Sequence, residues 1–150
     1  MSVLLDTNIL ARLAQSTSPQ HATARSAVDW LQKGGERICI VPQVLYEFWV
    51  ICTRPIGSPH NGLGLTIDQV KAEVSRAQTL FAFLPDTSDV YTEWERLVVQ
   101  HAVKGRNAHD ARLVASMNVH GISRLLTFNG LDFSRYAEIR IIDPTGAAAG

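Results

Sequence analysis

Short apolar runs alternate along the chain with longer stretches in which apolar residues recur at helical spacing. The runs are short enough to be buried strands, and turn or capping residues follow them. Strands separated by helices favour a parallel sheet with right-handed crossovers, and so an α/β domain. The expected strands cover residues 3–5, 37–41, 124–127 and 139–142.

Capping residues set the expected limits of the helices. Ser18-Pro19 has the residue types of a helix start, and Thr66 with Gln69 has the spacing of a capping box. Gly34-Gly35 is typical of a helix end. The expected helices cover residues 9–15, 19–33, 42–53, 66–83, 88–103 and 107–120.

A chain of 150 residues fits one domain that buries a core without disulfides. Its 46% hydrophobic and 19% charged residues are typical of a soluble globular protein. No apolar stretch approaches the roughly 18 residues that span a bilayer, so we expect a cytoplasmic protein that does not associate with membranes. Residues 1–144 are expected to form the domain, and the small-residue tail at 145–150 is expected to be disordered.

The 14 basic residues balance the 14 acidic residues. Net charge therefore provides no broad attraction to nucleic acid. If this protein binds RNA, the affinity must come from a local basic rim or from a bound cation. The balance argues against a non-specific RNA-binding protein.

Three carboxylates lie directly after a predicted strand or in a predicted helix near the sheet. Asp6 follows the first strand, Glu47 lies in the helix after the second strand, and Asp110 lies in the first turn of a later helix. In an open parallel sheet, ligands bind beyond the carboxyl ends of the strands. Helical spacing further predicts that two of these acids interrupt apolar faces: Glu47 with Val44, Val50 and Ile51, and Asp110 with Leu113, Val114 and Met117.

Converging carboxylates on apolar faces need a cation, because burying an unpaired carboxylate is costly. Oxygen ligands without neighbouring Cys or His favour Mg²⁺ or Mn²⁺ over Zn²⁺. The sequence therefore predicts a Mg²⁺ or Mn²⁺ site made by Asp6, Glu47 and Asp110. Taken singly, each acid has an ordinary interpretation: Asp6 as a helix cap, Glu47 as a solvated residue, and Asp110 as a charge favoured at a helix N-terminus.

Four stretches in this order and spacing resemble the PIN (PilT N-terminus) domain, specifically the single-domain VapC-type toxins of toxin–antitoxin operons. They are LLDTNIL at 4–10, VPQVLYEFW at 41–49, GRNAHDARLVA at 105–115 and LLTFNGLDF at 125–133. The resemblance covers nearly all of residues 3–144. It implies a three-layer α/β/α fold with a central parallel sheet, and a Mg²⁺ or Mn²⁺ site at the three acids named above.

The resemblance also implies an activity and partners. Family members are metal-dependent endoribonucleases that cut RNA, frequently tRNA or ribosomal RNA, and leave 5′-phosphate and 3′-hydroxyl ends. They are often homodimers and are held silent by a cognate antitoxin. The basic residues nearest the expected site, and so the candidates for guiding the RNA backbone, are Arg12, Lys104, Arg106 and Arg112.

One position departs from the family pattern. The usual fourth acid is here Asn129, which can still ligate a metal through its carbonyl, while Asp132 could supply the missing charge. We favour Asn129 at the site and Asp132 as a cap or supporting group, because Asn129 lies closer to the end of its strand. Polar positions that commonly support such sites are matched by Thr7, Asn8 and Thr127.

Two other interpretations of these residues compete with a nuclease. A phosphatase of the haloacid dehalogenase group would use Asp6 as a nucleophile, but it needs a second Asp where this chain has Asn8. A catalytically silent PIN domain that binds RNA or a protein is motivated by Asn129 and the neutral charge. Retention of all three main acids argues against it.

Overall fold

The computed structural model describes residues 1–59 and 61–149. Within these ranges five strands form one sheet in the order β3-β2-β1-β4-β5, and every neighbouring pair is parallel. This confirms the predicted parallel α/β sheet. The strands are β1 (Ser2–Leu5), β2 (Arg37–Ile40), β3 (Ala82–Phe83), β4 (Arg124–Leu126) and β5 (Arg140–Ile142).

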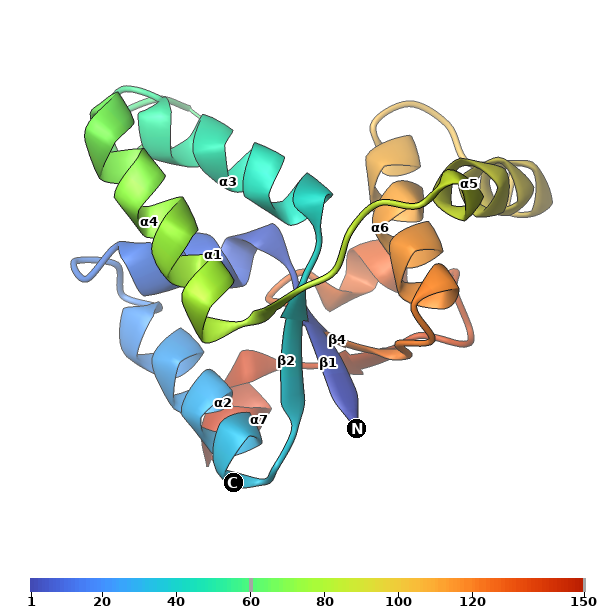
Figure 1. The fold of residues 1–150 in the computed structure, drawn as a ribbon, viewed down its shortest axis with the longest axis horizontal. Helices are drawn as coiled ribbons and strands as arrows, with labels where there is room; N and C mark the ends of the chain where they lie inside the picture. The colour runs from blue at the N-terminus through green and yellow to red at the C-terminus, as the bar shows by residue number, and fades with distance from the viewer. Residues whose placement is uncertain (60, 150) are drawn as a thin grey trace.

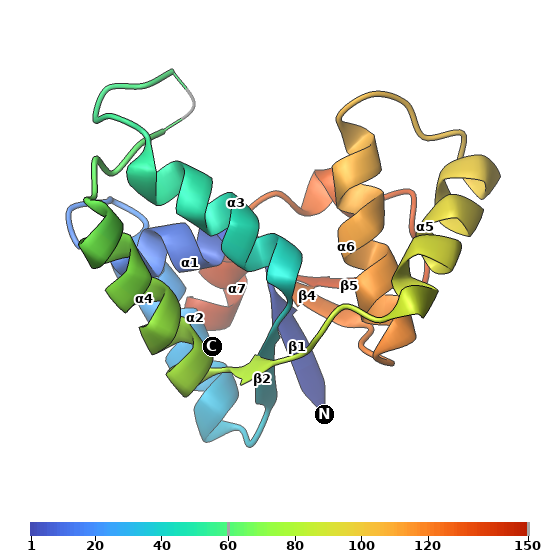
Figure 2. The same ribbon diagram turned by 45° about the horizontal axis from the view of Figure 1, so that its top comes forward.

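The helices cover both faces of the sheet and complete a three-layer α/β/α fold (Figure 1). Helices α1 to α4 and α7 lie on one side, and α5 and α6 lie on the other, as Figures 1 and 2 both show. The helices of the described residues are α1 (Thr7–Ala14), α2 (His21–Lys33), α3 (Pro42–Thr53), α4 (Ile67–Leu80), α5 (Ser88–Gln100), α6 (Asn107–Val119) and α7 (Pro144–Ala149), with a 3₁₀ turn at Gly130–Phe133.

The strand order creates a switch point in the middle of the sheet. From β1 the chain winds outward through β2 to β3, then returns across the sheet to β4 and β5 on the other side of β1. The two connections that leave this point cover opposite faces, and ligands of open parallel sheets bind at such a point, beyond the carboxyl ends of the strands. At this point the two strands end in apolar residues, Leu5 and Leu126, whose side chains are completely buried.

Local signals explain most of the observed helix limits. Thr66 and Gln69 form the predicted capping box, with each side chain bonded to the other residue's backbone amide. The helix after it ends at Leu80 rather than near Phe83, because Ala82–Phe83 pairs with β2 as the short strand β3. A strand of two residues has no alternation that the sequence could reveal.

Residues 145–149 of the tail expected to be disordered belong to helix α7, and Gly150 lies outside the described residues. Asp143 caps this helix by accepting a hydrogen bond from the Thr145 amide (2.8 Å), and Pro144 begins it. Pro144 and Ala147 are buried, and the helix packs against α2. Small side chains allow this close packing, whereas the tail's composition alone suggested disorder.

None of the helices within residues 1–59 and 61–149 combines the length and the apolar character needed to cross a bilayer.

Candidate functional site

The end of β1 places Asp6 at the switch point of the sheet. Leu5 pairs with Leu126 in the register of β1 and β4, so the residues that follow, Asp6 and Thr127, lie side by side. The Asp6 amide donates to the Leu126 carbonyl (3.0 Å), which continues the ladder for one more bond. Asp6 also caps α1, since its Oδ1 accepts from the Thr7 amide at 2.7 Å.

The other carboxylate oxygen of Asp6 is held by a polar cluster at the same strand ends. The Thr127 hydroxyl donates to Asp6 Oδ2 (2.8 Å), and Asn8 Nδ2 donates to the same oxygen (3.4 Å) and to Thr127 Oγ1 (3.1 Å). Asn8 Oδ1 in turn accepts from the Phe128 amide at 3.2 Å. The side chains of Asn8 and Thr127 and the backbone amide of Thr7 therefore fix the orientation of the Asp6 carboxylate.

Glu47 enters the site from α3, but the apolar face predicted for it is wrong. The buried side of α3 includes Val44, Phe48 and Cys52, whereas Val50 is 46% exposed. Helices α1 and α4 pack against α3 on that buried side. Glu47 therefore lies beside the buried stripe, at its edge, rather than within it.

Asp110 lies in the first turn of α6, on the opposite side of the sheet's carboxyl end from α3 (Figure 2). The residues predicted to share its face, Leu113, Val114 and Met117, are buried as expected. Among the described residues, no hydrogen-bond donor and no Lys, Arg or His side chain is paired with its carboxylate. Asp110 is thus a partly buried acid without a partner in that part of the chain.

Burial and mutual repulsion raise the pKa of all three carboxyls. Burial is the largest cause for Asp110, whose pKa rises to about 6, and the charges of Asp132, Asp6 and Glu47 add to it. Burial also raises the pKa of Glu47, with a further contribution from Asp6. For Asp6, burial raises the pKa more than hydrogen bonds from Thr127 and Thr7 lower it. The acids therefore sense one another across the sheet end.

Asp132 and Asn129 contribute to this region in different ways. The Asp132 charge is the largest electrostatic cause of the raised pKa of Asp110, and it also acts on Asp6. Asn129 is exposed, and its backbone amide donates to Thr127 Oγ1 at 3.0 Å. The choice between these two residues as the fourth ligand stays a prediction, but Asp132 brings its charge to the site.

A family profile for the PIN domain matches residues 3–139 of this chain. The chain belongs to the PIN-domain family. The match covers all the strand ends and helices described above as far as Ile139, including Asp6, Glu47 and Asp110. No curated protein sequence matches the chain.

Solved structures with the same fold come from several bacteria. VapBC2 of Rickettsia felis, bound to a promoter DNA fragment, is 15% identical with a TM-score of 0.70 over 95% of this chain and 98% of that one. VapC20 of Mycobacterium tuberculosis, a sarcin–ricin loop cleaving toxin, is 21% identical with a TM-score of 0.66, covering 92% and 98%. A toxin–antitoxin complex of Klebsiella pneumoniae is 20% identical with a TM-score of 0.64, covering 95% and 97%. At these identities the likeness establishes the fold.

The donor chemistry of this PIN domain fits a hard divalent cation. Asp6, Glu47 and Asp110 offer carboxylate oxygens, and burial raises the pKa of each of these carboxyls. Within residues 1–59 and 61–149, no three His, Cys, Asp or Glu side chains lie close enough to hold one ion as they stand. Binding an ion would require these carboxylates to move together.

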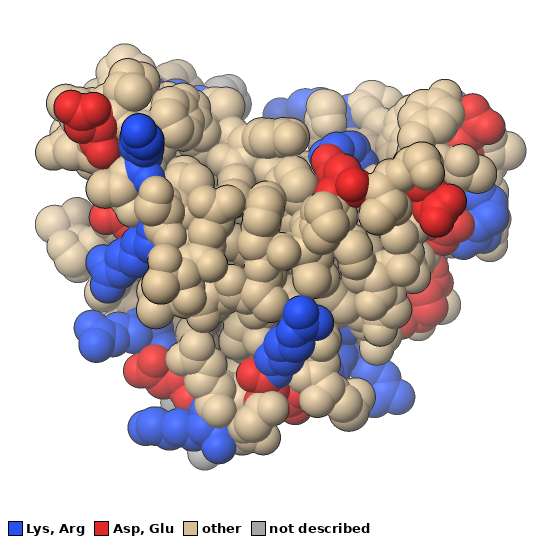
Figure 3. Space-filling model, viewed as in Figure 1, with Lys and Arg blue, Asp and Glu red and all other residues tan. Residues whose placement is uncertain are grey.

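The four basic residues expected near the site differ in their hydrogen bonds, ion pairs and exposure. Arg12 bonds to the side chains of Gln20 and Gln15, and Arg112 forms an ion pair with Asp86 at 3.0 Å. Lys104 and Arg106 are exposed in the turn before α6. On the face shown in Figure 3, Lys and Arg side chains lie apart from one another and form no continuous basic patch.

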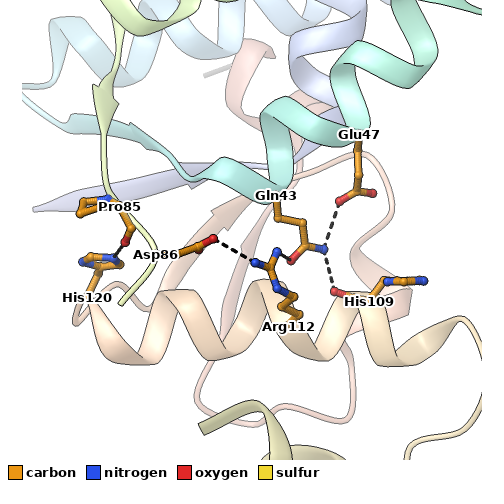
Figure 4. A network of polar contacts seen from close by, with 7 residues as sticks. All are labelled: Gln43, Glu47, Pro85, Asp86, His109, Arg112 and His120. Atoms are coloured by element: carbon orange, nitrogen blue, oxygen red, sulfur yellow. Dashed lines mark hydrogen bonds and ion pairs between the residues drawn. The ribbon is translucent and has the colours of Figure 1, made fainter. Parts of the chain in front are cut away.

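Sequence reasoning missed one polar residue at the site of this PIN domain, Gln43. Its amide bonds to Glu47 on its own helix and to the His109 carbonyl on α6 (Figure 4). A glutamine in the first turn of a helix is usually solvated, so the residue type alone did not indicate a role at the site. The available signal was its spacing, four residues before Glu47, which puts both side chains on one helical face.

Proposed function

We propose that this PIN domain is a Mg²⁺- or Mn²⁺-dependent endoribonuclease and the toxin of a type II toxin–antitoxin pair. The observation that carries the proposal is that burial raises the pKa of the Asp6, Glu47 and Asp110 carboxyls, and that the charges of Asp6 and Glu47 add to this shift at Asp110. The fold that the chain shares with VapC structures, one of them an RNA-cleaving toxin, supports it.

The three acids would hold the ion from different elements of the fold. Asp6 is oriented by the Thr7 amide and the Thr127 hydroxyl, while Glu47 and Asp110 approach from helices on opposite faces of the sheet. When bound, a divalent ion acidifies a water molecule and offsets charge that gathers on a phosphodiester. The protein supplies no side-chain nucleophile in this scheme.

The RNA backbone is proposed to meet the site from the α5–α6 side. Lys104 and Arg106 are exposed there, and phosphate contacts from such residues position RNA without reading its sequence. Arg112 is a weaker candidate because Asp86 already pairs with it. With few basic contacts and no net charge, RNA affinity should depend on the bound cation as well as on this rim.

We further propose that a cognate antitoxin silences the site and that the toxin is a homodimer. Three carboxylates with raised pKa values favour a guanidinium, which can bind carboxylate oxygens in place of the metal. An antitoxin complex with an Arg or Lys side chain among Asp6, Glu47 and Asp110 is the expected result. Contacts confined to other surfaces would contradict it, and light scattering of the isolated toxin tests the dimer.

Cleavage of a structured RNA tests the nuclease proposal. Purified protein should cut the RNA with Mg²⁺ or Mn²⁺, lose this activity in excess EDTA, and regain it when the ion is restored. Undiminished cleavage in EDTA would overturn the metal mechanism. Tight binding of RNA without cleavage at any metal concentration would instead favour the catalytically silent PIN domain.

A further inference from the structure

Gln43 is a buried polar residue in a position where a helix usually carries a solvated one. It lies in the first turn of α3 and is only 6% exposed, between Pro42 and the apolar Val44. Burying an amide is unfavourable unless its donors and acceptor are satisfied. The partners of Gln43 therefore identify what this residue does.

Both partners of its amide nitrogen belong to the carboxylate site. Gln43 Nε2 donates to Glu47 Oε1 at 3.1 Å and to the backbone carbonyl of His109 at 2.8 Å. A primary amide has two N–H donors, so this group uses both. Because His109 directly precedes Asp110, Gln43 links the helix that carries Glu47 to the helix that carries Asp110.

A second pair of residues fixes which way the amide points. Gln43 Oε1 accepts from Arg112 NH1 at 3.3 Å, and Arg112 NH2 pairs with Asp86 at 3.0 Å (Figure 4). The flipped amide would place Oε1 against the Glu47 carboxylate and the His109 carbonyl, both acceptors, and its nitrogen against a guanidinium. The observed orientation satisfies every donor and acceptor of the amide.

We propose that Gln43 is a positioning residue that sets the Glu47 carboxylate relative to Asp110, with Arg112 and Asp86 holding its amide in the required orientation. The inference rests on the proposed function, since it concerns the ion that these acids bind. It differs from a packing role because the hydrogen bond from Gln43 reaches an acid of the site directly. Asp86 extends the assembly to the β3–α5 connection through its ion pair with Arg112, so residues of three separate segments take part.

The test compares Mn²⁺ affinity in Gln43→Met and in the wild type, by calorimetry on metal-free protein. Methionine keeps the length of the side chain but removes the donors and the acceptor. We expect Mn²⁺ binding to weaken by about 10–100-fold, as for other groups that orient metal ligands. The matched control is Gln78→Met on α4, an exposed position, which should leave the affinity unchanged.

A double-mutant cycle separates positioning from general stability. If Gln43 acts through Glu47, then Gln43→Met should cost no further Mn²⁺ affinity in a Glu47→Ala background, as measured by electron paramagnetic resonance of Mn²⁺. A purely structural role would weaken binding equally in both backgrounds. Equal losses, or unchanged affinity in Gln43→Met, would overturn the inference.

The outcomes distinguish this inference from the proposed function. A wild-type protein that binds no Mn²⁺ overturns both, whereas normal binding in Gln43→Met overturns the positioning role alone. If Gln43→Met does not fold, Asp86→Ala takes its place, because it frees Arg112 while keeping the charge of Arg112. We then expect Mn²⁺ affinity to fall by about two- to fivefold. The control is Asp89→Ala, which removes an exposed acid in the first turn of α5, and equal Mn²⁺ affinities in the two variants would contradict the assembly.

Discussion

Asp6 accepts three hydrogen bonds from within the protein, whereas the Asp110 carboxylate has no hydrogen-bond or ion-pair partner among the described residues. Both acids face the same sheet end, and both have raised pKa values. The fold itself orients Asp6, since its bonds come from the first turn of α1 and from Thr127 at the end of β4. Asp110 is placed by α6 but accepts no hydrogen bond from the described residues, and three neighbouring acids raise its pKa, so a cation would act most strongly on it.

The largest expected effect is on cleavage, through the acid that the fold holds in place. Asp6→Asn should reduce RNA cleavage by at least about a hundredfold, because it removes a negative ligand and gives the Thr127 hydroxyl an amide to face. The fold should survive, since Asn also caps helices. Cleavage assays and circular dichroism measure both.

Loss of the fold together with activity would show that Asp6 is needed for structure, and it would weaken the comparison between Asp6 and Asp110. Asp29→Asn, an exposed acid on α2, is the control for loss of one charge.

The second effect should have opposite signs for binding and for stability. Asp110→Asn should abolish measurable Mn²⁺ binding while raising the free energy of unfolding of metal-free protein at pH 7 by about 1–2 kcal/mol. The reason is that Asn keeps the shape but removes a charge repelled by Asp132, Asp6 and Glu47. Urea denaturation in EDTA measures the stability.

The gain in stability expected for Asp110→Asn should also depend on pH. The pKa of Asp110 in the folded protein, about 6, lies above its ordinary value of 3.8, so the folded state binds the proton more tightly. The wild type therefore loses stability as the pH rises from about 4 through 6, and Asp110→Asn should not show this part of the loss. A stability difference that is the same at pH 4 and pH 7 would contradict uncompensated charge as its cause.

A smaller effect is expected from the hydroxyl that orients Asp6. Thr127→Val preserves the side-chain shape but removes the donor to Asp6 Oδ2, and it should weaken Mn²⁺ binding by about tenfold. Thr79→Val on the exposed side of α4 should not change it. Equal Mn²⁺ affinities in Thr127→Val and the wild type would show that the Asp6 carboxylate needs no such support.

The sequence predicted the neighbours of Asp6 better than it predicted the contacts between α3 and α6. Asp6 and Thr127 follow apolar strands, so parallel topology alone brings them together. Gln43 could not be found by composition, since its burial depends on α6 packing across the sheet end. Glu47 was assigned to the wrong face for a similar reason, because tertiary contacts of α3 decide which side is buried. The strand β3 and the helix α7 were missed because short or small-residue segments carry little periodicity.

The smallest expected effects concern the fourth position. Asn129→Asp should tighten Mn²⁺ binding, because it adds a charge at the position where the family usually has an acid. Asp132→Ala should reduce cleavage far less than Asp110→Ala does, although the Asp132 charge acts on Asp110. Equal losses from the two alanine variants would assign the fourth position to Asp132.

Anomalous X-ray diffraction from crystals grown with millimolar Mn²⁺ tests the central claim most directly. We expect an anomalous peak among the carboxylates of Asp6, Glu47 and Asp110, which should lie closer together than in the metal-free protein. The peak should disappear in Asp110→Asn crystals grown under the same conditions. A peak bound elsewhere, or no peak among these three side chains, would contradict a cation site at the end of β1.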